Sequence, residues 1–259
     1  EGNDFGSRNV SYLDPPRIAL INGEGVSPTA FGELWHYFEQ DLAYPIEVLN
    51  TEYFSSVDLT VYDKLILPTG NYRRYADELF GFLDVGGSVI ALEQAITFAT
   101  SYGEKEESPT RLGRELARRE AQEEAEEEKE VVQLDRYAYD SRERERLKSR
   151  VVGSIFEVSI DTSHPLGYGM SERSFLLKRN SRIYPFLPEG AWNVGTFEGD
   201  AHRSGFTGSV LRKDLQNTLA FGQESFGEGT LIYFVDSPII RQFWYSGKML
   251  LGNAVFFGE

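Results

Sequence analysis

Glu93 occupies a position at which many α/β enzymes carry their nucleophile. Residues 86–95 are typical of a glycine turn, a short apolar strand and a sharp exit, and Glu93 directly follows the strand. Hydrolytic and amidotransfer domains of this class present a cysteine there, and a neighbouring base activates its thiolate. The chain of 259 residues contains no cysteine, and a carboxylate cannot replace a thiolate as the attacking group. We therefore predict an enzyme-like scaffold without catalytic residues.

Three further polar residues also follow predicted strands, namely Glu24, Asn71 and His164. In open α/β sheets, ligands bind in the crevice at the carboxyl ends of the strands. We therefore expect Glu24, Asn71, Glu93 and His164 to line a candidate pocket for a small ligand or peptide. The alternative for Glu93 is a structural carboxylate that caps the next helix. The alternative for His164 is a turn histidine that bonds nearby backbone.

His36 and Glu39 have the spacing of a possible metal site. Their H-x-x-E pattern supplies two zinc ligands in carboxypeptidases, and His164 could complete the set. Helical geometry argues against this site, because the apolar stripe of the same helix puts His36 on nearly the opposite side, where it meets solvent. We predict no metal ligands in this chain.

The glycines at Gly23 and Gly25 do not make a nucleotide-binding loop. The third glycine of a G-x-G-x-x-G motif would fall at Pro28, and no G-K-[ST] motif is present. A tight strand-to-helix turn explains these glycines, and we predict no cofactor.

The elements that would position these residues alternate between strands and helices over the first hundred residues. Short apolar runs predict strands at 17–22, 46–50, 64–68 and 88–92, with helices at 28–42 and about 73–84. This alternation indicates a parallel sheet with helices on both faces. In the first helix, the spacing predicts a buried stripe of Phe31, Leu34, Trp35, Phe38 and Leu42.

The pattern changes twice along the rest of the chain. Residues 103–150 are densely charged and lack an apolar stripe, which predicts a solvated helical insertion with ion pairs or, alternatively, a lid or docking arm. Beyond Arg150, strands are predicted near 155–161, 174–178, 191–197, 205–211, 218–222 and 230–236, and a helix near 243–257. We expect Trp192 and Trp244 to serve the core. Residues 1–13 form a predicted tail, and 14–259 a single domain.

Composition narrows the possible partners. The formal net charge is −15 and the sequence pI about 4.7, so the surface repels phosphate backbones and anionic membranes, and we expect neither as a partner. No apolar run approaches the roughly 20 residues of a membrane span, and no signal segment is present. The chain begins at Glu1 without methionine, from which we expect a processed product or a fragment.

Several segments in order resemble the class I glutamine amidotransferase-like domain that follows the catalytic domain in certain bacterial zinc carboxypeptidases. The matching segments are residues 17–20, 23–25, 34–40, 62–72, 164–169, 192–195 and 243–248. The resemblance implies a flavodoxin-like sheet with additional C-terminal strands, and a periplasmic or extracellular location. It also implies that the peptidase chemistry and its zinc belong to a separate domain. Glu93 aligns with the amidotransferase cysteine, and residues 164–166 do not match the His-x-Glu pair of glutaminases.

The sequence therefore favours a non-catalytic accessory domain that packs on or regulates the peptidase domain of the same protein and binds a small ligand at the strand ends. The alternative is a hydrolase in its own right. It would be either an amidase that uses Glu93 and His164, or a zinc peptidase that uses His36 and Glu39.

Overall fold

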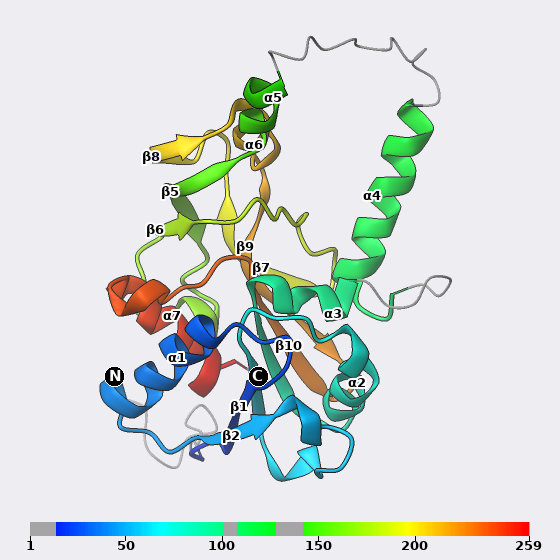
Figure 1. Cartoon of the computed structure of the whole chain (residues 1–259), viewed down its shortest axis with the longest axis vertical. Coiled ribbons are helices and arrows are strands. Elements are labelled where there is room, and N and C mark those ends of the chain that lie inside the picture. Colours follow the sequence, from blue (N-terminus) through cyan, green and yellow to red (C-terminus); the bar gives the residue numbers. More distant parts are fainter. Residues whose placement is uncertain (1–13, 101–107, 128–141, 259) are drawn as a thin grey trace, which may run out of the picture.

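One mixed β-sheet runs through the molecule in the computed structural model, which describes residues 14–100, 108–127 and 142–258 (Figure 1). The predicted tail 1–13 and parts 101–107 and 128–141 of the charged insertion lie outside the described residues. The parallel half of the sheet has the order β2 (Glu47–Asn50), β1 (Ile18–Asn22), β3 (Lys64–Leu67), β4 (Ser88–Leu92) and β10 (Gly229–Phe234). The predicted parallel strands of the first hundred residues are confirmed.

The antiparallel half begins where β10 pairs with β9. It continues with β9 (Thr218–Phe226), β7 (Ala191–Phe197), β5 (Val151–Ile160) and β6 (Arg173–Lys178), while β8 (His202–Thr207) also pairs with β5. The predicted strand at 205–211 is only half right. Residues 209–214 instead form helix α6 (Ser209–Asp214), which starts after Gly208.

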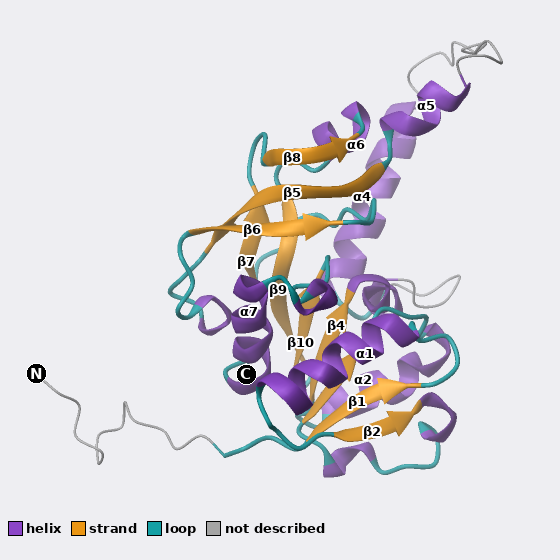
Figure 2. Ribbon diagram, turned by 60° about the vertical axis from the view of Figure 1, so that its left-hand side comes forward, coloured by secondary structure: helices purple, strands orange, loops and turns teal. Residues whose placement is uncertain are grey.

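Alternating side chains of the central strands bury themselves in two apolar clusters, one on each face. In β1, Ile18 and Leu20 belong to one cluster, and Ala19 and Ile21 to the other. Helices α1 (Pro28–His36) and α7 (Tyr245–Phe256) cover the first face, and α2 (Ala76–Asp84) covers the second (Figure 2). The short helix α3 (Thr97–Thr100) also packs on the second face. Both faces of the parallel strands are therefore covered.

Helix α1 starts as its sequence predicts but ends differently. Ser27 Oγ accepts a hydrogen bond from Ala30 N, and Pro28 is in the first turn. The last turn widens into a π-helical segment, Tyr37–Asp41, which changes the angle between successive side chains. Tyr37 joins the core, and Leu42, which follows the π-helical segment and which the stripe predicted as buried, is exposed. Trp35 was also predicted as buried, but it lies before this segment in the regular part of α1 and is exposed.

The charged insertion contains two described helices, α4 (Arg111–Glu127) and α5 (Arg142–Lys148), which confirms its helical character there. Helix α4 projects from the body (Figure 1), and Glu115 pairs with Arg118 and Arg119. Glu224 of β9, which is far away in the sequence, contacts the first turn of α4 directly and anchors it. The buried Glu224 carboxylate accepts hydrogen bonds from Arg111 N at 2.7 Å and Leu112 N at 3.5 Å, and a short one from the Tyr233 hydroxyl.

Within the described residues, no helix combines the length and the apolar character that crossing a bilayer requires. Near the C-terminus, α7 confirms the helix predicted near 243–257, and it buries Leu250 and Leu251. Trp244 donates its indole N–H to Phe175 O on β6.

Candidate functional site

Glu93 lies at the carboxyl end of β4, in a strained backbone conformation. Its φ angle is 52°, in the left-handed region that costs a non-glycine residue about 1 kcal/mol or more. The side chain is nevertheless buried, with only 8% of its surface exposed. The predicted sharp exit is therefore present, and it turns a carboxylate inward. This occurs at the carboxyl-terminal ends of the strands, where ligands of open α/β folds bind.

The side chain of Asn180 connects Glu93 to a second carboxylate. Asn180 Nδ2 lies 3.4 Å from Glu93 Oε1, 2.8 Å from Asp236 Oδ1 and 3.3 Å from Val235 O. Asn180 Oδ1 accepts a hydrogen bond from Arg182 N at 2.9 Å, which is consistent with this orientation of the amide. The capping alternative for Glu93 is not observed, since its side-chain bond goes to Asn180 rather than to the following turn.

Beneath Asn180 lies a fully buried ion pair. Lys178 Nζ is 2.9 Å from Asp236 Oδ2, and the side chains are 0% and 2% exposed. Lys178 also donates to Arg182 O at 2.8 Å. Strands β9, β7 and β5 separate β6 from β10 in the sheet, so these contacts require the antiparallel half to curl back over the end of β10.

Burial and neighbouring charges act on Glu93 in opposite directions. Burial raises the pKa of Glu93, and the negative charge of Asp236 raises it further, while Arg179, Arg182 and the Asn180 hydrogen bond lower it. Burial likewise raises the pKa of Asp236, against the ammonium group of Lys178. The site can therefore hold a proton on a buried carboxyl, but it presents no activated nucleophile.

Glu24 and Asn71 follow β1 and β3, at the same end of the parallel strands as Glu93. They line a cavity of about 280 Å³ together with Arg73 and Arg74, and Glu93 is not among the residues that line it. Arg74 forms an exposed ion pair with Glu24 at 3.1 Å. Gln94 N lies 3.3 Å from the hydroxyl oxygen of Thr69, which links the exit of β4 to that of β3.

His164 does not lie at the carboxyl-terminal ends of the parallel strands. It follows β5, which runs antiparallel to β7 and therefore also to β4 and β10. The carboxyl end of β5 therefore lies beside the amino-terminal ends of the parallel strands. The ring Nδ1 accepts a hydrogen bond from Leu166 N at 3.2 Å. His164 therefore caps a short turn, in agreement with the alternative that it is a turn histidine bonded to nearby backbone. Burial lowers the pKa of His164. Trp192, which we expected in the core, is 59% exposed and packs beside this ring.

His36 and Glu39 are exposed on the outer side of α1 and its π-helical turn. Among the described residues, no three His, Asp or Glu side chains are grouped as a metal site would require. The H-x-x-E spacing therefore has no third ligand in this part of the chain.

Sequence reasoning missed Lys178, Arg179, Asn180, Arg182 and Asp236. Asp236 is the last residue of the predicted strand 230–236 and lies just beyond the end of β10, so the rule of strand ends that selected Glu93 could have found it. The other four lie at the end of β6, and only the curl of the sheet brings that end to Glu93.

No protein-family model and no curated protein matches this chain. Solved structures do match it. A ThuA-like protein from Parabacteroides merdae has a TM-score of 0.53 at 10% identity, covering 95% of this chain and 91% of that one. A ThuA-like protein from Bacteroides uniformis has a TM-score of 0.52 at 11% identity, with 96% and 94% covered. A protein from Thermoplasma acidophilum described as a GMP synthase subunit has a TM-score of 0.50 at 10% identity, with 95% and 94% covered.

The predicted fold class is confirmed. The chain has a mixed α/β fold similar to ThuA-like and glutamine amidotransferase-like structures, in agreement with a flavodoxin-like sheet flanked by helices. At identities this low the likeness concerns the fold alone.

Proposed function

We propose that this chain is a non-catalytic domain that binds a small ligand beside Glu93 and acts as an accessory to a separate enzyme domain. One observation carries the proposal: the elbow position of an enzyme-like fold is occupied by a buried carboxyl bonded to Asn180. The carboxylate is a poor nucleophile, and His164 lies at the opposite ends of the strands from Glu93. Neither member of a nucleophile–base pair is therefore in place.

The partner part of the proposal follows from the sequence resemblance. The resemblance implies that the enzyme is a secreted zinc carboxypeptidase, with the catalytic zinc in its own domain and both domains in the periplasm or outside the cell. This chain would pack on the peptidase domain of the same protein and position or regulate it.

The first test is the inertness of the purified chain. We expect no hydrolysis of glutamine, amides or peptides above the rate of the Glu93→Ala variant, with or without added zinc. Turnover that Glu93→Ala abolishes would contradict the proposal. The second test uses calorimetry to measure whether this chain binds the peptidase domain that is encoded in the same reading frame. One-to-one binding is expected, and a reading frame without such a domain, or no binding, would overturn the carboxypeptidase assignment.

One observation favours a second candidate, a hydrolase in which Glu93 acts as general acid or base. A strained residue with a raised pKa is typical of catalytic groups. Its partner would have to be Asp236 rather than His164, because Asp236 shares the Asn180 amide with Glu93. A pH–rate profile that changes in Glu93→Gln but not in His164→Ala would support this candidate.

A further inference from the structure

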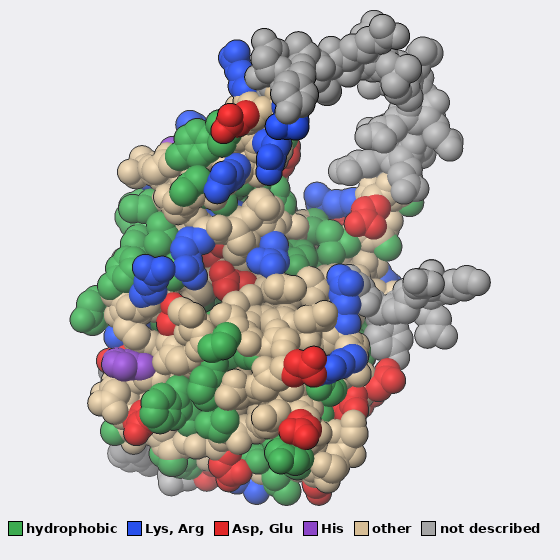
Figure 3. Space-filling view, viewed as in Figure 1, with side chains coloured by type: hydrophobic (Ala, Val, Ile, Leu, Met, Phe, Trp, Pro, Cys, Tyr) green, Lys and Arg blue, Asp and Glu red, His purple; other side chains and the backbone are tan. Residues whose placement is uncertain are grey.

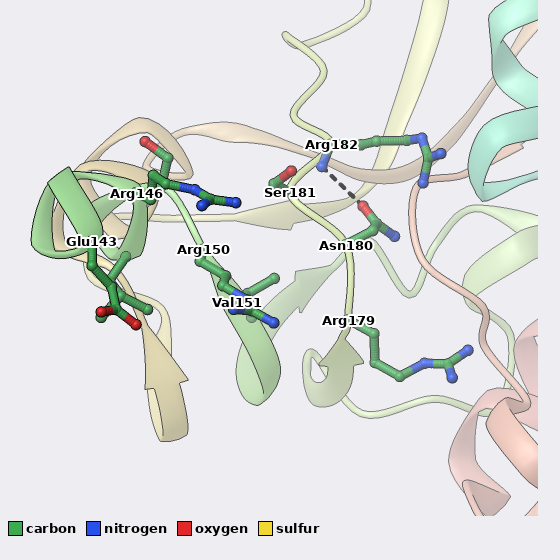
Figure 4. Close-up of a pocket in the computed structure, with 10 residues that line it drawn as sticks. Glu143, Arg146, Arg150, Val151, Arg179, Asn180, Ser181 and Arg182 are labelled. Carbon is green, nitrogen blue, oxygen red and sulfur yellow. Dashed lines mark hydrogen bonds between the residues drawn. The ribbon is translucent and has the colours of Figure 1, made fainter.

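A groove runs between α5 and the loop of residues 179–182 (Figure 4). Its volume of about 750 Å³ is within the range of about 300–1,000 Å³ typical of small-molecule sites. Its charged lining consists of Arg146, Arg150, Arg179 and Arg182 against the single carboxylate of Glu143. The groove is therefore basic on a chain whose net charge is −15.

The four arginines differ from most others in the described segments. Arginines that lie in ion pairs elsewhere are Arg17, Arg74, Arg118, Arg119, Arg173, Arg203 and Arg212. Within the same described segments, no groove arginine has a carboxylate at ion-pair distance. Arg179 and Arg182 act on Glu93 only from beyond ion-pair distance. Gathering like charges that have no ion-pair partner destabilises a fold, and a bound anion reduces that cost.

The directions of the side chains indicate how many charges the ligand carries. Arg146 and Arg150 reach toward the loop from the α5 side, whereas Arg179 and Arg182 extend from the far side of the loop (Figure 4). Basic side chains are also visible around α5 and in the middle of this face of the molecule (Figure 3). The two pairs lie on opposite sides of the loop, so a ligand that contacts both pairs carries at least two anionic groups.

The loop that carries Arg179 and Arg182 also carries Asn180, which bonds to Glu93. This loop therefore connects the groove, which Asn180 lines, to Glu93. The guanidinium fork of arginine matches the oxygen pairs of phosphate and carboxylate groups, and Ser149 and Ser181 add hydroxyl donors to the lining.

We propose that this groove binds a small polyanion, a ligand with at least two phosphate or carboxylate groups. The inference names the ligand class of the proposed function and rests on its ligand-binding part.

The experiment titrates the full chain with tripolyphosphate and, separately, with citrate by calorimetry at low ionic strength. Saturable one-to-one binding of either probe is expected, and the tighter probe identifies the anionic group. Arg146→Gln and Arg179→Gln remove one charge from each side of the loop, and each should weaken binding about tenfold. Arg144→Gln is the matched control: it lies on α5 outside the groove and should change Kd less than about twofold.

Three results would overturn the inference: no saturable binding of either probe, equal weakening by Arg144→Gln, or unchanged binding in the Arg146→Gln/Arg179→Gln double variant. Circular dichroism of each variant checks that it is folded. Failure of both probes would leave the accessory role standing, because that role is tested by inertness and by peptidase binding. Conversely, amide turnover would overturn the accessory role while polyanion binding remained measurable.

Discussion

At the residue scale, the fold shifts the protonation of Glu93 by burying its carboxyl group. Because burial raises its pKa, the ionised form is less favourable in the folded than in the unfolded chain. Its contribution to stability is therefore fully present below its ordinary value of 4.5 and is lost as the pH rises through the folded-state pKa.

Glu93→Gln should remove this loss, because glutamine is neutral and still offers an oxygen to Asn180. We expect Tm to rise by about 2 °C at about pH 7.5, with the difference disappearing toward about pH 4. Differential scanning calorimetry across this pH range measures the effect. Glu39→Gln, on the exposed side of the π-helical turn, should change Tm by less than about 1 °C. An equal rise at both pH values would show that ionisation of Glu93 is not the cause.

Lys178→Met should be among the more damaging substitutions in the chain. It leaves Asp236 buried without its cation, which costs about 3 kcal/mol or more. Urea unfolding should show this loss, whereas Lys213→Met on the exposed side of α6 should remain within about 0.5 kcal/mol of the parent. Similar effects of the two changes would mean that the ion pair contributes little.

At the element scale, the projecting helix α4 depends on a contact far away in sequence. Glu224 satisfies backbone N–H groups of its first turn, and Thr110 Oγ1 accepts a further bond from Gly113 N at 3.0 Å. The helix beyond that turn has little apolar surface to hold it against the sheet. Its attachment is therefore concentrated at its N-terminus.

Glu224→Ala should release this attachment and cost about 2–3 kcal/mol, since buried donors lose their acceptor. Hydrogen exchange should accelerate at residues 111–116, while α2 keeps its protection. Glu228→Ala, in the exposed turn between β9 and β10, is the control and should leave both helices unchanged. Unchanged exchange at 111–116 in Glu224→Ala would contradict the anchoring role.

The same scale shows why sequence reasoning located some of the site and not the rest. The exit at Glu93 was predictable because the glycines and the apolar run before it are local signals. The π-helical turn was not, because the stripe through Trp35 and Leu42 fits a regular helix equally well. Asn180 could not be assigned, because its contact with Glu93 depends on the curl of the sheet. His164 was grouped with Glu93 because a strand end can be read from sequence, whereas the direction of that strand cannot.

At the scale of the whole molecule, separate polar groups lie at the two ends of the strands. Glu93 and Asn180 lie at the carboxyl-terminal ends of the parallel strands, and His164 and Trp192 lie at the opposite ends. Sites that share no partners act independently, so Glu93→Ala and His164→Ala should change the free energy of unfolding additively, within about 0.5 kcal/mol. A double-mutant cycle by urea unfolding measures this. A coupling above about 1 kcal/mol would show that the two residues communicate and would revive the hydrolase that pairs them.

The position of β10 has a consequence for synthesis on the ribosome. Its residues 229–234 fill the gap beside β4, which is made of residues 88–92. A nascent chain can therefore complete β1 to β4 long before the strand that closes their edge emerges from the exit tunnel. During that interval Val89 and Ile90 flank an open, strongly apolar edge that can pair with other chains. Chains halted before residue 229 should consequently aggregate or remain bound to chaperones, whereas the finished chain buries this edge within itself.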